Sequence, residues 1–143
     1  MSAEENKAMF RRLMDEVVNK GNLDIIDELV AADVVEHEEL LPGLPQNREG
    51  VKQFFAILRS AFPDIKATIE DVIAEGDRVV ARGTMSGTHQ GEFMGIPATG
   101  KKVSFGAIDI LRITNGKFVE HWGLTDSMAM MQQLGVIPGP GAG

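Results

Sequence analysis

The spacing of apolar residues changes once along the chain, near Pro63. Before this point apolar residues recur every three or four positions, which predicts three amphipathic helices with one apolar face each. The apolar stripes cover residues 9–18, 23–30 and 51–62. Gly21 closes the first helix and Pro63 stops the third, because both residues commonly end helices.

After residue 64 the apolar runs become shorter, richer in β-branched residues and bounded by turn residues, which predicts four strands. We expect these strands at residues 65–74, 78–89, 102–114 and 117–125. The last two are separated by Asn-Gly, a pair suited to the two positive φ angles of a type I′ turn. They are therefore expected to form an antiparallel hairpin.

A short C-terminal helix is expected after Asp126, ending at Gly135. Helices followed by an antiparallel sheet predict an α+β fold, with three N-terminal helices packed on one sheet face. The length of 143 residues suits one hydrophobic core, so we predict a single domain over residues 1–137. Residues 138–143 consist of proline, glycine and one alanine and are expected to form a flexible tail.

The chain carries a net charge of −7 and contains no cysteine. The negative charge argues against nucleic acid and anionic membranes as partners, because both would repel the protein. Without cysteine there is no disulfide, no thiol nucleophile and no cysteine-based zinc site. The N-terminus lacks a signal-peptide pattern and no apolar run is long enough to span a membrane, so we expect a soluble, cytoplasmic protein.

Several short motifs carry a family resemblance. Residues 87–91 read Gly-Thr-His-Gln-Gly, residues 95–100 read Gly-Ile-Pro-Ala-Thr-Gly, and residues 120–122 read Glu-His-Trp, with Asp126 shortly after them. With these motifs and the segment 41–45, the chain resembles the SnoaL-like polyketide cyclases of the nuclear transport factor 2 superfamily.

The resemblance implies a strongly curved antiparallel sheet that wraps around the helices as a cone and leaves a pocket at its open end. Concave, mostly apolar cavities with a few polar groups commonly bind small molecules. The resemblance also implies intramolecular aldol ring closure of a hydrophobic carbonyl compound, by acid–base catalysis without a metal or organic cofactor.

Histidine transfers protons near neutral pH, and the chain contains three histidines, His37, His89 and His121. His121 lies in the last predicted strand, and its Glu-His-Trp motif favours the pocket over a half-buried structural role. His37 belongs to a short edge segment, residues 33–39, where the family places a polar residue at the pocket mouth, or it is a solvated loop residue. His89 lies in a turn, where polar groups often bond the local backbone, which argues against a catalytic role. We therefore place it among the pocket-lining residues and not among the catalytic ones. No spacing typical of a metal site, such as His-x3-His, is present.

Asp109 interrupts an apolar stretch in the third predicted strand and is the leading catalytic partner for His121. A carboxylate beside a histidine on an apolar face is typical of acid–base sites. Counting back from the Asn-Gly turn, an ideal register pairs Asp109 with Trp122 and His121 with Ile110, which puts Asp109 and His121 on opposite faces. A one-residue bulge would return them to one face. The sequence leaves both arrangements open.

Asp126 matches the aspartate that follows Glu-His-Trp in the family, and it also has the position of a helix N-cap. The best studied cyclases of the family use an acid–base aspartate two residues after the strand histidine, where this chain has Gly123. The catalytic carboxylate would then come from Asp109 or Asp126, or the reaction would differ.

Apolar side chains from the third helix, the glycine-rich loop and the third strand are expected to line the pocket. They are Phe54, Phe55, Leu58, Met94 and Phe105. Core packing is the alternative role, and for Phe54 and Leu58 it is the commoner one.

Two other functions are compatible with the chain. A binding protein that keeps the pocket without the chemistry would explain Gly123. An epoxide hydrolase on the same fold would need Asp, Arg and Asp to converge on a water, and Arg78, Arg82 and Arg112 are available.

The strand faces opposite the pocket carry Ile108, Ile110, Trp122 and Leu124. A contiguous apolar patch predicts a homodimer through the sheet face, because a two-fold pair buries the same patch twice. Alternatively, the C-terminal helix covers these side chains and the protein is a monomer.

Overall fold

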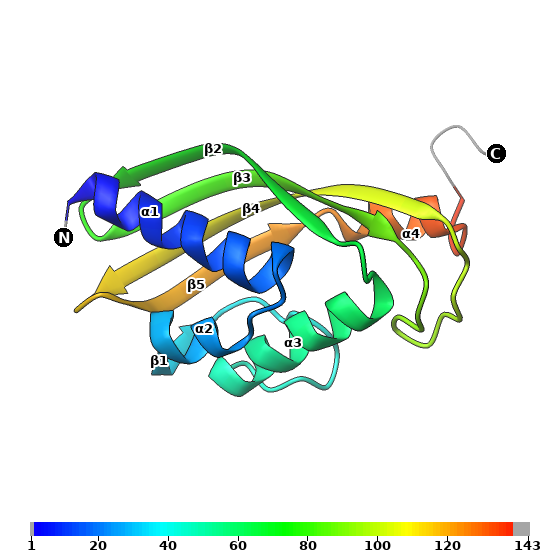
Figure 1. Cartoon of the computed structure of the whole chain (residues 1–143), viewed down its shortest axis with the longest axis horizontal. Helices are drawn as coiled ribbons and strands as arrows, with labels where there is room; N and C mark the ends of the chain where they lie inside the picture. Colours follow the sequence, from blue (N-terminus) through cyan, green and yellow to red (C-terminus); the bar gives the residue numbers. More distant parts are fainter. Residues whose placement is uncertain (1, 139–143) are drawn as a thin grey trace.

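The computed structural model describes residues 2–138, in which a five-stranded sheet carries three N-terminal helices on one side (Figure 1). The expected α+β fold is confirmed. Of the expected tail, residues 138–143, all but Pro138 lie outside the described residues. The elements in chain order are α1 (Ala3–Leu13), the π-helical segment η1 (Met14–Asn19), α2 (Asp24–Leu29), β1 (Val30–Glu36), α3 (Arg48–Ala61), β2 (Lys66–Glu75), β3 (Arg78–Thr88), β4 (Lys102–Thr114), β5 (Lys117–Thr125) and α4 (Ser127–Leu134).

The first helix begins at a capping box and changes its winding half-way. The Ser2 side chain accepts a hydrogen bond from the Glu5 backbone N–H, and the Glu5 side chain accepts one from the Ser2 backbone, both at 3.1 Å. After Leu13 the helix continues as the π-helical segment η1 instead of the single α-helix expected. Asn19 at its end accepts a hydrogen bond from Ala67 N at 2.7 Å, which ties the helix to β2.

The sheet has the strand order β1-β5-β4-β3-β2. The four predicted strands form an antiparallel meander from β2 to β5, and each begins and ends within one residue of the expected positions. The fifth strand, β1, was expected only as a short edge segment, and it pairs with β5 in parallel. The sheet is therefore mixed, and the expectation of a purely antiparallel sheet was wrong. Parallel strands are not joined by a tight turn, so no local signal in the sequence indicated this pairing.

The β4–β5 hairpin is confirmed, and its register contains one irregularity. Asn115 and Gly116 have φ angles of 53° and 72°, the two positive values that a type I′ turn needs. Beyond the turn, the pairing shifts by one residue before Arg112 meets Glu120. Val119 is therefore the extra residue of a β-bulge in β5.

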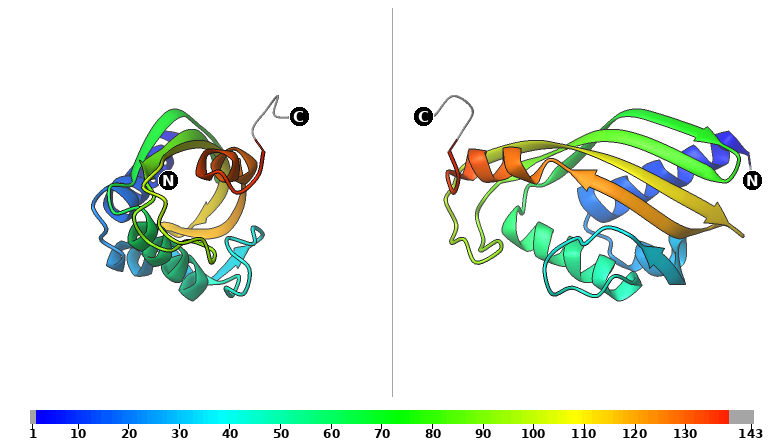
Figure 2. Two further views of the ribbon diagram at one scale, coloured as in Figure 1. Left: turned by 90° about the vertical axis from the view of Figure 1, so that its right-hand side faces the viewer. Right: turned by 180° about the vertical axis from the view of Figure 1, so that it is seen from behind.

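Viewed end on, the sheet curves around the helices without closing into a barrel (Figure 2). The main core lies between α1, η1, α3 and the concave sheet face, and includes the fully buried Val17, Leu58 and Phe118. At the far end α4 packs on β4, where the Gln133 side chain bonds both the backbone N–H and the carbonyl of Ser104. Within residues 2–138, no helix is long and apolar enough to cross a membrane.

Candidate active site

The helices and the concave sheet face enclose a cavity with an apolar wall and one polar end. The helical wall includes Phe10, Phe54 and Phe55, and the sheet wall includes Phe105 and Leu111. The polar end combines side chains from three neighbouring strands and the segment after β1, namely Glu36, Glu38, Asp109, His121 and Thr125. A concave apolar site with a few convergent polar groups is the usual architecture for binding a small organic molecule.

Three of the six residues predicted for the pocket line this cavity, namely Phe54, Phe55 and Phe105. The structure places the others elsewhere. Leu58 faces the core and is 2% exposed, because it lies on the buried stripe of α3. Met94 is exposed in the loop between β3 and β4, where its backbone has a positive φ of 52°.

His89, the third of these, is buried outside the cavity and fastens the β3–β4 loop. Its Nδ1 accepts a hydrogen bond from Thr99 N at 3.3 Å and lies 3.0 Å from Thr99 Oγ1. Its ring lies 5.5 Å from that of Phe62 at the end of α3. The loop backbone is also bonded to Ala61 through the N–H groups of Gln90 and Gly91. The β3–β4 loop is thus fixed by hydrogen bonds within the loop and to the end of α3, and His89 has the local hydrogen-bonding role that is common in turns.

His121 lies at the polar end between two carboxylates from neighbouring strands. Its Nδ1 is 2.6 Å from Glu36 Oε1 on β1, and its Nε2 is 2.8 Å from Asp109 Oδ1 on β4. The Val119 bulge produces this arrangement, because it places His121 opposite Leu111 and on the same sheet face as Asp109. Both carboxylates are acceptors only, so both ring nitrogens of His121 act as donors.

The three residues form a charged cluster centred on an imidazolium. Burial by itself lowers the pKa of His121, but the hydrogen bonds to Asp109 and Glu36, and the charges of both carboxylates, raise it to about 10. His121 therefore carries a positive charge at neutral pH. Its donor capacity is fully used by Glu36 and Asp109, so the ring holds these carboxylates in place.

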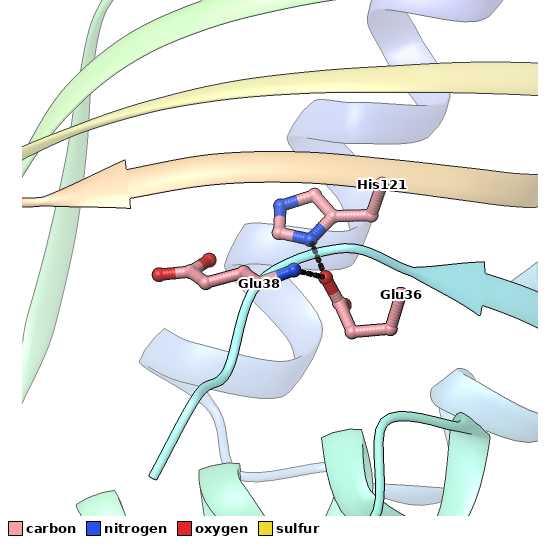
Figure 3. A group of neighbouring side chains, drawn as sticks. All are labelled: Glu36, Glu38 and His121. Carbon is pink, nitrogen blue, oxygen red and sulfur yellow. Dashed lines mark hydrogen bonds and ion pairs between the residues drawn. The ribbon is translucent and has the colours of Figure 1, made fainter.

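A second glutamate from the same segment extends this cluster (Figure 3). The Glu38 backbone N–H donates to Glu36 Oε1 at 2.9 Å, and the Glu38 carboxylate accepts a hydrogen bond from Thr125 Oγ1 at 3.3 Å. Burial raises the pKa of Glu38, the charges of Asp109 and Glu36 add to the increase, and the charge of His121 opposes it.

Donor atoms of Glu36, Glu38 and His121 lie within 4.8 Å of one another, a spacing compatible with a metal ion. A histidine binds a metal through a neutral ring nitrogen with a free lone pair. Here each ring nitrogen of His121 donates to a carboxylate, and the pKa of about 10 keeps the ring protonated. A metal ion here would have to displace a ring proton of His121 together with its hydrogen bond to Glu36 or Asp109.

Comparisons with known proteins agree with this fold. A family model described as SnoaL-like polyketide cyclase matches residues 8–134. The chain belongs to the SnoaL-like polyketide cyclase family. Over 132 residues it is 35% identical to the aklanonic acid methyl ester cyclase DauD of Streptomyces sp. (strain C5), covering 87% of this chain and 78% of that protein.

A second curated relative is the nogalonic acid methyl ester cyclase of Streptomyces nogalater, 29% identical over 119 residues, which are 82% of this chain and 88% of the relative. Among solved structures, TsrD from Streptomyces laurentii superimposes with a TM-score of 0.86 at 28% identity, covering 96% of this chain and 99% of TsrD. The chain is thus an enzyme of the cyclase type.

In this SnoaL-like cyclase, Gly123 makes room for the polar cluster. A Cβ at this position would lie 2.8 Å from Asp109 Oδ1 and 2.9 Å from His121 Cε1, and it would collide with the Glu38 carboxylate. Real Cβ atoms do not approach other atoms this closely. Where the sequence suggested a missing aspartate, the structure therefore brings in carboxylates from two other strands.

His37 and Trp122 lie on the opposite, outer sheet face, because His37 alternates with Glu36 and Glu38 along the chain. The His37 ring stacks on Trp122 with ring centres 4.9 Å apart, and its Nε2 lies 2.7 Å from Glu120 Oε2. The prediction that His37 assists catalysis in the pocket therefore does not agree with its position.

Asp126 is the N-cap of α4 and accepts a hydrogen bond from Ala129 N at 3.0 Å. It lies outside the cavity lining, in the position of the helix cap. The three arginines considered for an epoxide hydrolase are also outside this lining. Arg78 lies over Trp122, Arg82 pairs with Asp71, and Arg112 pairs with Glu120.

The sequence analysis did not include Glu36 and Glu38 among the site residues. The sequence did contain a signal for these two residues. Val34, Glu36 and Glu38 are two positions apart and so lie on the same face of an extended segment, and Val34 is a core residue. An acidic residue that continues the apolar phase of a strand points to a buried partner of opposite charge. The partner, His121, is 85 residues away in sequence.

Proposed function

We propose that this cyclase closes a ring in a hydrophobic polyketide ester by an intramolecular aldol reaction, without a metal or organic cofactor. The observation that carries the proposal is the contact of Asp109 with the His121 imidazolium at the polar end of an otherwise apolar cavity wall. The named substrates of its relatives, aklanonic and nogalonic acid methyl esters, support the substrate class.

Asp109 has the geometry of the general base. Its Oδ1 accepts a hydrogen bond from His121, which fixes the carboxylate and leaves Oδ2 for the substrate. A proton on a carbon between two carbonyl groups is already acidic, so a positioned carboxylate can remove it. The positive charge of His121 also stabilises the enolate that forms beside it.

The enolate carbon then attacks a second carbonyl carbon of the same molecule, and the new alkoxide oxygen takes a proton. One carbon–carbon bond forms, one carbon–oxygen π bond is lost, and the product is an isomer of the substrate. The apolar side chains of the cavity wall, Phe54 and Phe105 among them, hold the carbon chain of the substrate folded, with the two reacting carbons close together. Such orientation accounts for several kcal/mol of barrier lowering in intramolecular reactions.

The test is turnover of aklanonic acid methyl ester, used as a probe, followed by liquid chromatography and mass spectrometry. Wild type should give a product of unchanged mass and altered retention time. Asp109→Asn should lower kcat by about 100-fold or more, the usual contribution of a general base. Asp126→Asn is the matched control, because it makes the same chemical change outside the cavity and should retain the wild-type kcat.

The opposite result would favour the binding-protein alternative. If the probe and related polyketide esters are recovered unchanged after incubation with wild type, but raise its melting temperature, the cavity binds these esters without catalysis. Equal kcat values for wild type and Asp109→Asn would remove Asp109 from the mechanism.

We also propose that the enzyme forms a homodimer through the outer sheet face. Ile73, Val80, Ile110 and Trp122 pair in one continuous row across β2, β3, β4 and β5 on this face. Leu124, in the next row, is 82% exposed. The buried residues of α4 pack at the far end of β4 and leave this patch open, and a second copy would cover it.

Sedimentation equilibrium at micromolar concentration tests the dimer. Wild type should sediment with twice the chain mass of 15.5 kDa, and Leu124→Glu should give a folded monomer. Met94→Glu is the control, since it introduces the same charge at an exposed residue of the β3–β4 loop. A wild-type mass of one chain at all concentrations would refute the dimer.

A further inference from the structure

Among the described residues, Glu38 is the one cavity-lining carboxylate whose side chain has no hydrogen bond or ion pair to a cation. Glu36 and Asp109 each bind a ring nitrogen of His121, whereas the side-chain partner of Glu38 among the described residues is the neutral Thr125 hydroxyl. Its side chain nevertheless points into the cavity, because Glu38 alternates with the outward His37. The site therefore contains carboxylates in two different environments.

The surroundings of Glu38 also favour its protonated form over its charged form. The charged groups that face Glu38 are His121 from β5, Asp109 from β4 and Glu36 from β1, while the helices contribute apolar side chains to the cavity wall. Burial disfavours the charged form of Glu38, the charge of His121 opposes this effect, and the two negative neighbours add to it, so that the pKa is raised. A raised pKa favours the protonated carboxyl group, which is the form that a general acid needs.

We propose that Glu38 is the general acid of this enzyme and delivers the proton to the carbonyl oxygen that the enolate attacks. This inference rests on the proposed aldol reaction. Asp109 takes the proton from carbon, the new carbon–carbon bond forms, and the Glu38 O–H proton passes to the alkoxide oxygen. Afterwards Asp109 is protonated and Glu38 ionised, and exchange with water restores both for the next turnover.

Gly123 supports this assignment by its position between the groups. A Cβ on residue 123 would collide with the Glu38 carboxylate and would lie 2.8 Å from Asp109 Oδ1. Glu38 and Asp109 therefore approach the same small space from two strands. Both side chains also line the cavity, so a substrate bound there meets the base and the acid together, as ring closure requires.

The test compares Glu38→Gln with Glu39→Gln. Both variants replace an ionisable carboxyl group by an amide of the same shape, but Glu39 is exposed and outside the cavity lining. Glu38→Gln should lower kcat by about 100-fold, the usual contribution of a general acid, whereas Glu39→Gln should retain the wild-type rate. Binding of the probe ester should persist in both variants, since the apolar wall is unchanged.

The pH profile separates a catalytic role from a structural one. A general acid must be protonated, so wild-type kcat should fall as pH rises through the pKa of Glu38, and Glu38→Gln should lose this fall. Thr125→Val removes the hydrogen bond that lowers the pKa of Glu38, so the fall should move to higher pH.

Two failures are distinguishable in this experiment. If wild type and Glu39→Gln turn over the probe and Glu38→Gln does so with the same kcat and pH profile, the role of Glu38 is refuted while the cyclase reaction stands. If wild type itself turns over no polyketide ester, the proposed reaction fails, and the role of Glu38 as its general acid fails with it.

Discussion

Asp109 and His121 lie on the same face of the sheet, with Oδ1 and Nε2 2.8 Å apart, although ideal pairing from the hairpin turn would separate them. The extra residue in β5, Val119, shifts the register so that His121 faces Leu111 and Asp109 faces Gly123. Because successive side chains of a strand point to opposite faces, one additional residue is enough to move His121 from one face to the other. The active site therefore depends on the bulge.

Replacing His121 by alanine should affect both catalysis and stability. The variant leaves Glu36, whose side chain is only 3% exposed, without its cationic partner. Breaking a buried ion pair in this way lowers the free energy of unfolding by about 3–5 kcal/mol. The variant should also have a lower kcat than wild type. Urea denaturation and turnover of the probe ester measure the two effects.

A double-mutant cycle with Glu36→Gln tests the cause. The loss of stability in the double variant should be smaller than the sum of the single losses, because the neutral glutamine no longer needs a cation. His37→Ala is the matched histidine control on the outer face and should retain kcat. Additive losses for His121→Ala and Glu36→Gln would contradict the ion pair.

The stability of the enzyme should depend on pH through His121. Its pKa is raised from 6.5 to about 10 in the folded state, so the stabilisation is fully present below pH 6.5 and is lost as pH rises through 10. One pKa unit corresponds to about 1.4 kcal/mol, so the raised pKa corresponds to about 5 kcal/mol. Urea denaturation between pH 6 and pH 10.5 measures this dependence.

His121→Ala isolates the histidine contribution from that of lysines that titrate in the same range. The stability difference between wild type and His121→Ala should be largest near pH 6 and should shrink towards pH 10.5. A difference that stays constant over this range would show that His121 does not titrate with the raised pKa.

Gly123→Ala should lower kcat by at least about tenfold and destabilise the fold by about 1–3 kcal/mol, as small-to-large changes in packed sites do. The added methyl group would displace the carboxylates of Glu38 and Asp109 and press on His121. Gly106→Ala is the control on the neighbouring strand β4, since its nearest contact would be an ordinary 3.8 Å to Gly83 O. Steady-state kinetics and thermal unfolding compare the two variants.

If Gly123→Ala and Gly106→Ala have the same kcat, the space around residue 123 is not part of the reaction site. A loss of stability in Gly123→Ala without a loss of kcat would show that the added methyl group disturbs packing but not the catalytic groups.

The sequence by itself determined most of the elements and the family. Helical spacing up to residue 62, β-branched runs after it and the Asn-Gly turn depend on local preferences, so the meander of β2 to β5 could be predicted to within one residue. The same local signals gave Asp126 the position of a helix N-cap beside the catalytic role that the resemblance suggested. The motifs around His121 identified the cyclase family, which the family model confirms.

Tertiary structure decided which residues meet. The parallel pairing of β1 with β5 brings Glu36 and Glu38 to His121, 85 residues away from Glu36, and no turn links these strands. The bulge at Val119 decides the face on which His121 lies. Both are choices of register, and a register is set by the packing of whole strands against each other and not by the residues of one strand.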